Sequence, residues 1–169
     1  MKLQGLSLGR AYLVRTLVGG VPYFDLSAEH HDLAIRSLRL SGQLWILIEA
    51  IVSRALLNRV RMRMQDAEAD LSEAEMIATR SSMLLWQIET ALERTSLALA
   101  LNDRDQAKKQ LSKTRELVKK TEKPWESRLY ECPDGHCPEY ASVFTKGEIV
   151  GYHCRNDEIE ALQRQIDLL

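Results

Sequence analysis

Apolar side chains recur at steps of three and four residues through most of the first 124 positions of this chain. That spacing places them on one face of an α-helix, because a helix completes a turn every 3.6 residues. Glycine and proline, which interrupt helices, number only eight and four among 169 residues. The fold class predicted from the sequence is therefore mainly α, with a body of antiparallel helices arranged as a bundle or as hairpins.

The predicted helices of this body cover residues 3–18, 28–64, 73–101 and 104–121. Ser27 is predicted to cap the second helix, and Ser72 with Glu75 forms an S-x-x-E capping box before the third. Residues 98–118 read as two helices joined by a tight turn. We find no second copy of this stretch at the spacing that is typical of tetratricopeptide repeats. We therefore interpret it as an ordinary antiparallel helix pair.

Composition narrows the class of protein further. The formal net charge is −1, so the molecule as a whole does not favour nucleic acid or anionic membranes. The longest apolar run, Leu44 to Val52, contains Glu49 and is far shorter than the roughly 20 residues that span a bilayer. The three cysteines form no recognisable disulfide framework. We expect a cytoplasmic protein with no membrane segment.

The character of the chain changes after Pro124. Residues 131–154 hold all three cysteines and two of the four histidines. β-forming residues alternate on both sides of Lys146-Gly147-Glu148, which predicts a small β-hairpin. A last helix is expected to begin at Asn156 or Asp157. The sequence thus predicts two parts: a helical body over residues 1–124, and a cysteine- and histidine-containing module with a closing helix over residues 125–169.

This module has the spacing of a structural zinc site. Cys132 and Cys137 flank a turn-forming loop, and a hairpin would return the chain to them about 15 residues later. About 30 residues cannot bury much apolar surface, so a metal ion would supply stability. The predicted ligands are three thiolates and one imidazole: Cys132, Cys137 and Cys154, with His153 or His136 as the fourth. The predicted module is therefore zinc-ribbon-like.

Other side chains have simpler interpretations. His30 and His31 lack a metal-ligand partner one helical turn later, and we expect both at the surface. Glu49 lies within an apolar run. If it is buried it needs a partner, either Arg54 or an arginine of another helix, and otherwise it lies at a rim. The tryptophans at 45, 86 and 125 are expected in the core or at an interface.

These features favour a non-enzymatic zinc-binding adaptor or regulatory subunit, which engages a protein partner or a second copy of itself through its helical surface. One alternative is a nucleic-acid-binding regulator that uses the metal module and a basic ridge containing Lys109, Lys113 and Lys120. A second is a thiol enzyme or redox sensor that uses Cys137 or Cys154.

Overall fold

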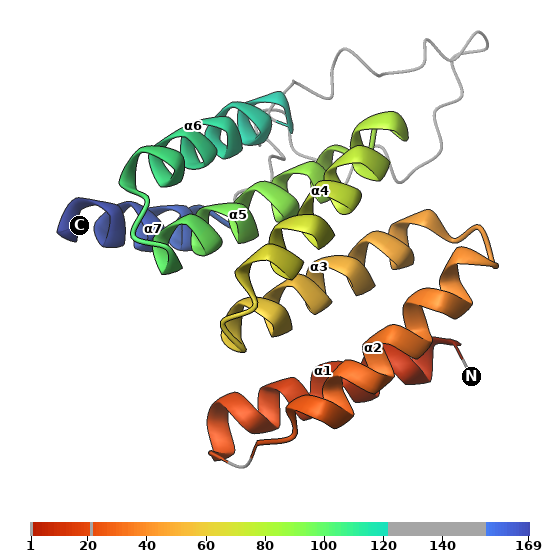
Figure 1. Cartoon of the computed structure of the whole chain (residues 1–169). Coiled ribbons are helices and arrows are strands. Elements are labelled where there is room, and N and C mark those ends of the chain that lie inside the picture. The colour runs from red at the N-terminus through yellow and green to blue at the C-terminus, as the bar shows by residue number, and fades with distance from the viewer. Residues whose placement is uncertain (1, 21, 122–154) are drawn as a thin grey trace, which may run out of the picture.

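The computed structural model of the chain describes residues 2–20, 22–121 and 155–169 (Figure 1). Every regular element in these ranges is an α-helix, and none of the described residues forms a strand. The helices are α1 (Lys2–Gly19), α2 (Phe24–Arg39), α3 (Leu44–Val60), α4 (Met64–Arg80), α5 (Leu84–Ala100), α6 (Arg104–Thr121) and α7 (Asn156–Leu168).

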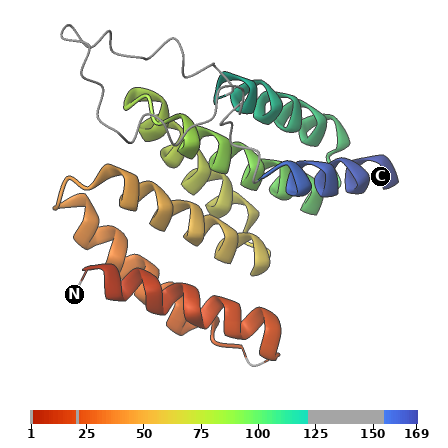
Figure 2. The ribbon, with the colours of Figure 1, turned by 180° about the vertical axis from the view of Figure 1, so that it is seen from behind.

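The helices pair as hairpins that stack side by side. The most extensive packing joins α1 to α2, α3 to α4, and α5 to α6, and α3 also packs against α5. Helix α7 contacts α5 and α6. It thus occupies the position that the first helix of a fourth hairpin would take. The first helices of the hairpins thus form one layer with α7, and α2, α4 and α6 form the other (Figures 1 and 2). Such stacking of similar hairpins is a helical-repeat architecture.

The turns between these helices recur at a constant interval along the chain. Helices α2 to α6 begin at residues 24, 44, 64, 84 and 104. A residue with positive φ lies in each intervening turn, at Gly42, Met62, Ser82 and Asn102. After α3, α4 and α5, the amide that follows the positive-φ residue donates a hydrogen bond to a carbonyl near the end of the helix, as Arg63 N does to Asn58 O at 2.8 Å. This left-handed cap ends each helix and reverses the chain in a short turn.

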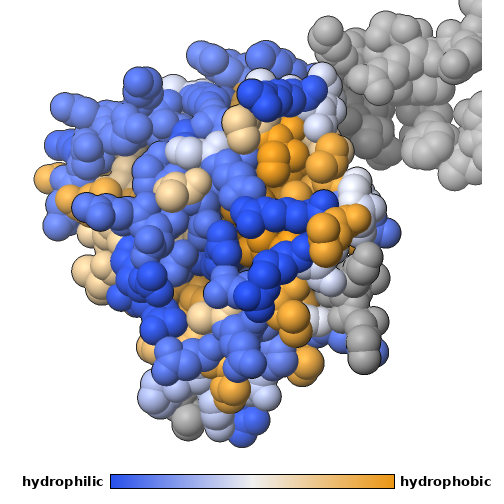
Figure 3. All heavy atoms as spheres, turned by 45° about the vertical axis from the view of Figure 1, so that its right-hand side comes forward, coloured by the Kyte–Doolittle hydropathy of each residue, from blue (hydrophilic) through white to orange (hydrophobic). Residues whose placement is uncertain are grey.

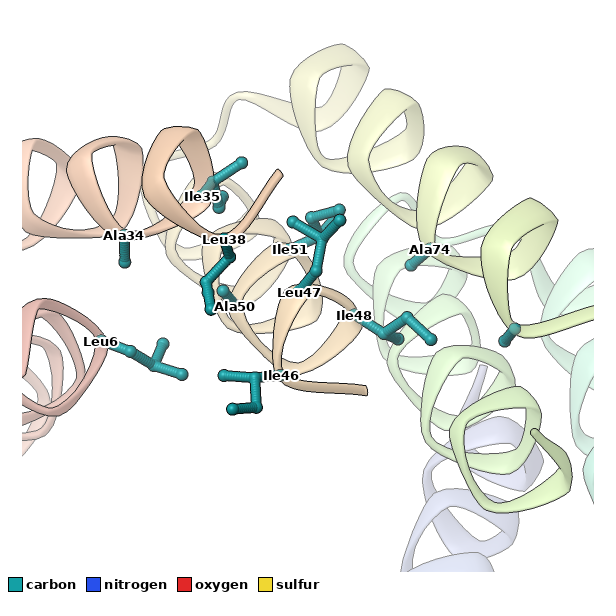
Figure 4. Close-up of a cluster of buried hydrophobic side chains, with 11 residues drawn as sticks. Leu6, Ala34, Ile35, Leu38, Ile46, Leu47, Ile48, Ala50, Ile51 and Ala74 are labelled. Carbon is teal, nitrogen blue, oxygen red and sulfur yellow. The ribbon is translucent and has the colours of Figure 1, made fainter. Parts of the chain in front are cut away.

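The core of the N-terminal half lies between the first two hairpins. Leu6 of α1, Leu38 of α2 and Ile46 of α3 are almost fully buried there. Figure 4 shows side chains of α1, α2 and α3 converging on this space, with Ala74 of α4 on the far side of α3. Helix α3 is apolar on several faces because it packs against neighbours on both sides.

A second core joins α5, α6 and α7. Leu92 and Leu111 pack with Ile159, Leu162 and Ile166 of the last helix, and all five are buried. The predicted apolar stripe of this last helix is confirmed. The buried face predicted for residues 104–121 is confirmed as well, because its four predicted members, Ala107, Leu111, Thr114 and Val118, are all buried.

The predicted body of antiparallel helices is confirmed, and its helices are arranged as hairpins. The predicted fold class is wrong in its C-terminal part. The zinc-ribbon-like β-hairpin is not supported, because the described part of the chain forms helices and turns but no strand, and it holds no group of side chains suited to a metal ion. Alternating β-formers are a weak signal, since an isolated two-stranded hairpin is marginally stable in water. The residues of that prediction, 131–154, lie outside the described residues.

Several predicted boundaries also differ from the structure. The helix expected over 28–64 is two helices, separated by a turn at Gly42. The helix expected over 73–101 belongs to α4 and α5, and the proposed capping residues Ser72 and Glu75 lie inside α4. Ser27 does not cap α2: it lies within that helix and is buried. None of the helices described here has the combination of length and apolarity needed to cross a membrane.

Candidate binding groove

A groove of about 510 Å³ opens along the layer formed by α1, α3, α5 and α7. Figure 2, seen from behind, turns this layer toward the viewer. The groove is lined by one run of residues from each helix: Arg10, Leu13, Val14 and Leu17 of α1; Glu49, Val52, Ser53 and Leu56 of α3; Leu85, Trp86, Glu89, Leu92 and Glu93 of α5; and Arg155 with Glu158 at the start of α7. It therefore exists only because the hairpins stack.

Much of the groove wall is apolar and reachable by solvent. Val14 and Leu17 of α1 are 58% and 52% exposed, and Leu85 of α5 is 49% exposed. Trp86 is half-buried between them and the core. Apolar side chains that stay half-exposed along a concave surface are typical of ligand-binding sites.

Ion pairs cross between neighbouring helices at the edge of this wall. Arg10 of α1 pairs with Glu49 of α3, so the structure has one of the alternatives left open for that carboxylate, an arginine of another helix. Arg155 donates two hydrogen bonds to Glu89, at 2.9 and 2.6 Å, and one to Glu158 at 2.8 Å. Arg59 donates to Glu93 at 2.6 Å. These pairs connect the helices that line the groove.

The carboxyl group of Glu93 has an unusual environment. Burial raises its pKa above the ordinary value, the hydrogen bond and charge of Arg59 oppose that shift, and the nearby charge of Glu158 adds to it. The α7 end of the groove is thus a place where negative charge is unfavourable unless a cation lies close by.

Two arginines at equivalent positions of successive hairpins hold the stack together away from the groove. Arg54 of α3 donates to Asp32 of α2 at 2.7 Å and to both oxygens of Asp70 in α4, at 2.6 and 3.1 Å. Burial disfavours the charged form of Arg54, but the bonds to Asp70 and Asp32 outweigh it and raise its pKa. Arg94 of α5 likewise pairs with Glu68 and Glu75 of α4.

His31 is buried, contrary to the prediction of a surface position. It lies at the junction of α1, α2 and α3, where its Nδ1 donates to the Ser27 carbonyl at 2.7 Å and its Nε2 accepts from Ser53 Oγ at 2.9 Å. The same Ser27 donates from Oγ to the Gly9 carbonyl at 2.9 Å. Burial lowers the pKa of His31, and Arg54 and Arg10 lower it further, while Ser27 and Asp32 oppose the shift. Its role is structural packing of three helices.

The zinc ligands predicted from the sequence, Cys132, Cys137, Cys154, His153 and His136, lie outside the described residues. Among residues 2–20, 22–121 and 155–169, no cluster of histidine, cysteine, aspartate or glutamate is arranged to hold a metal ion. The zinc site therefore stays a prediction. It is checked by elemental mass spectrometry of the untagged protein, with Cys132→Ser as the control.

The basic ridge predicted for nucleic-acid contact lies along α6. Lys109 and Lys120 are exposed, whereas Lys113 forms an ion pair with Glu75 of α4. The guanidinium of Arg94 shares that carboxylate, and although burial raises the pKa of Glu75, the two cations lower it overall. One of the three predicted lysines thus contributes to packing between helices, and nucleic-acid binding stays a prediction.

A second apolar surface lies at the turn between α2 and α3. Leu40 is 90% exposed there, and Trp45 at the start of α3 is 53% exposed. Figure 3 brings this side of the molecule forward, and hydrophobic side chains gather on it with charged side chains lying across them. Trp45 and Leu40 do not line the groove.

The chain matches no protein-family model, no curated protein and no solved structure. What the structure itself shows is a stack of helical hairpins with a groove along one layer. Sequence reasoning did not find the groove. One signal for it is the run Leu44–Val52, because a helix that is apolar on several faces has neighbours or ligands on more than one side.

Proposed function

We propose that this protein is a non-enzymatic adaptor or regulatory subunit that binds a segment of another protein in the groove. The observation that carries the proposal is the apolar wall contributed jointly by Val14, Leu17 and Leu85 from two different hairpins. Exposed apolar surface of this kind is costly in water unless a partner covers it.

The shape of the site supports a peptide segment as the occupant. Stacked hairpins present an extended concave surface rather than an enclosed cavity, and such surfaces are used to bind chains lying across several repeats. Four helices each contribute lining residues, so a bound segment would contact α1, α3, α5 and α7 together. A helical or extended segment that offers apolar anchors at regular spacing fits this surface.

The ion pairs between the helices that line the groove support binding without a large rearrangement of those helices. Arg155 ties α7 to α5 through Glu89, and Arg10 ties α1 to α3 through Glu49. The helices that form the wall are thus fixed relative to one another before a partner arrives. A preorganised surface loses less conformational entropy when a ligand binds.

The test is selection of binding peptides from a displayed random library, followed by measurement of their affinity for two variants. Leu85→Asp introduces a charge into the wall and is expected to lower the affinity of the selected peptides by about ten-fold or more. Leu40→Asp is the matched control, since Leu40 is exposed but does not line the groove.

Thermal melting first establishes that both variants are folded. A library that yields no binder, or binders equally tight on Leu85→Asp and on the unaltered protein, would overturn the proposal.

A further inference from the structure

The described lining of the groove holds more negative than positive charge. Its carboxylates are those of Glu49, Glu89, Glu93 and Glu158, whereas its guanidiniums are those of Arg10 and Arg155. Glu49 and Glu89 are the sixth residues of α3 and α5, so the repeat of the hairpins places one carboxylate on each. The excess of carboxylates is greatest on α5 and at the start of α7.

The arginines balance this charge unevenly. At the α1 end, Arg10 pairs with Glu49. At the α7 end, Arg155 is shared between Glu89 and Glu158. Glu93 is held by Arg59, which donates to it from outside the groove lining. The described lining at the α7 end thus contains three carboxylates, those of Glu89, Glu93 and Glu158, and the guanidinium of Arg155.

Glu93 and Glu158 are two carboxylates that act on each other. Burial is the main cause that raises the pKa of Glu93, whose side chain is only 14% exposed; Arg59 opposes that shift, and the charge of Glu158 adds a smaller contribution to it. Leu92 and Trp86 are also part of this lining. A cationic side chain placed here would offset the repulsion, and its aliphatic stem or guanidinium plane would pack on the apolar surface.

We infer that the partner is a segment with both apolar and basic side chains, and that one of its lysines or arginines binds between Glu93 and Glu158 while its apolar side chains cover Val14, Leu17 and Leu85. This inference rests on the proposed function and adds the chemistry of the partner. Complementary charge of this kind selects among partners that offer similar apolar contacts.

The experiment uses three synthetic peptides of equal length, about 15 residues, with leucine at the same positions and lysine, glutamine or glutamate at the others. Their affinities for the full chain are measured by fluorescence anisotropy at fixed ionic strength. We expect the leucine–lysine peptide to bind about ten-fold tighter than the leucine–glutamine peptide, and the glutamate peptide to bind weakest.

Two variants locate the preference. Glu158→Gln is expected to reduce the preference for lysine over glutamine several-fold. Glu160→Gln removes the same charge from the same helix, but Glu160 does not line the groove, so it should keep the preference. If Glu160→Gln and Glu158→Gln reduce it equally, general attraction accounts for binding and the inference is wrong.

The outcomes separate the two proposals. If the glutamine or glutamate peptide binds as tightly as the lysine peptide, and all lose affinity on Leu85→Asp, the partner is not basic but the groove still binds a segment. If Leu85→Asp leaves every peptide unaffected, the proposed function fails, and this inference fails with it.

Discussion

A Cβ atom built on Gly9 of α1 would lie 2.7 Å from Nδ1 of His31 in α2. The ring cannot move away easily, because Ser27 and Ser53 bind its two nitrogens and the side chain is fully buried. The absence of a side chain at Gly9 is thus what allows α1 and α2 to approach. Gly5, one turn earlier on the same helix, has its nearest neighbour at 3.6 Å and tolerates a methyl group.

We expect Gly9→Ala to lower the free energy of unfolding by about 1–3 kcal/mol, the usual cost of forcing an extra carbon into a packed site. Gly5→Ala should instead raise it by up to about 1 kcal/mol, because alanine favours the helix and no contact opposes it. Chemical denaturation of both variants checks this. Equal stabilisation by the two substitutions would contradict the described packing of His31.

Protonation of His31 is expected to destabilise the fold. Burial lowers its pKa in the folded state below the ordinary 6.5, so the unfolded chain binds a proton more readily. The free energy of unfolding should therefore fall as pH drops below about 6.5 and level off below the folded-state pKa. Urea denaturation between pH 8 and about 5 measures this slope. His31→Asn should flatten it, and an unchanged slope in that variant would assign the pH dependence to other groups.

The ion pair of Arg54 and Asp70 is expected to matter more than that of Arg54 and Asp32. The Asp70 side chain is 8% exposed and accepts from both Arg54 and Asn58, whereas the Asp32 side chain is about half-exposed. Asp70→Ala should cost about 3 kcal/mol, because it leaves a partly buried guanidinium without its main partner. Asp32→Ala should cost about 0.5 kcal/mol, in the range of exposed pairs. Similar losses in the two variants would contradict this ranking.

The left-handed turns offer a route to greater stability. Met62 has a φ of +59°, a conformation that a side chain with a Cβ atom adopts at a cost. Met62→Gly should raise the free energy of unfolding by about 1 kcal/mol. Asn102→Gly should gain less, since asparagine tolerates this region better. Thermal melting distinguishes the two, and a loss of stability in Met62→Gly would show that the exposed methionine side chain makes contacts worth more than the relief.

Sequence patterns predicted some elements well because local signals and tertiary packing agree there. Residues 104–121 form a helix with the predicted buried face, since a turn precedes the helix and its apolar residues form a narrow, regularly spaced stripe. The two missed turns carry weaker signals. Gly42 is a single glycine inside the apolar pattern of residues 28–64, and Ser82 lies in a turn with no glycine or proline nearby.

The groove and the buried histidine depend on contacts between distant parts of the chain. Glu75 was predicted to cap its own helix, but it pairs with Arg94 and Lys113 from the next two helices. His31 was predicted at the surface because nothing nearby in sequence reveals that Gly9 makes room for it. Neither relationship is encoded in a local pattern. The regular interval between the turns is visible only once the turn geometry is known, since the residues in the four turns differ.

Each described helix packs mainly against helices that are adjacent or next but one in the order of described elements. Cooperativity in such a stack passes only from neighbour to neighbour. Loosening the junction at His31 should therefore open the first hairpin while the amides of α5, α6 and α7 remain protected from hydrogen exchange. The chain would then come apart from one end, so that α1 could leave its side of the groove while α5 and α7 still hold theirs.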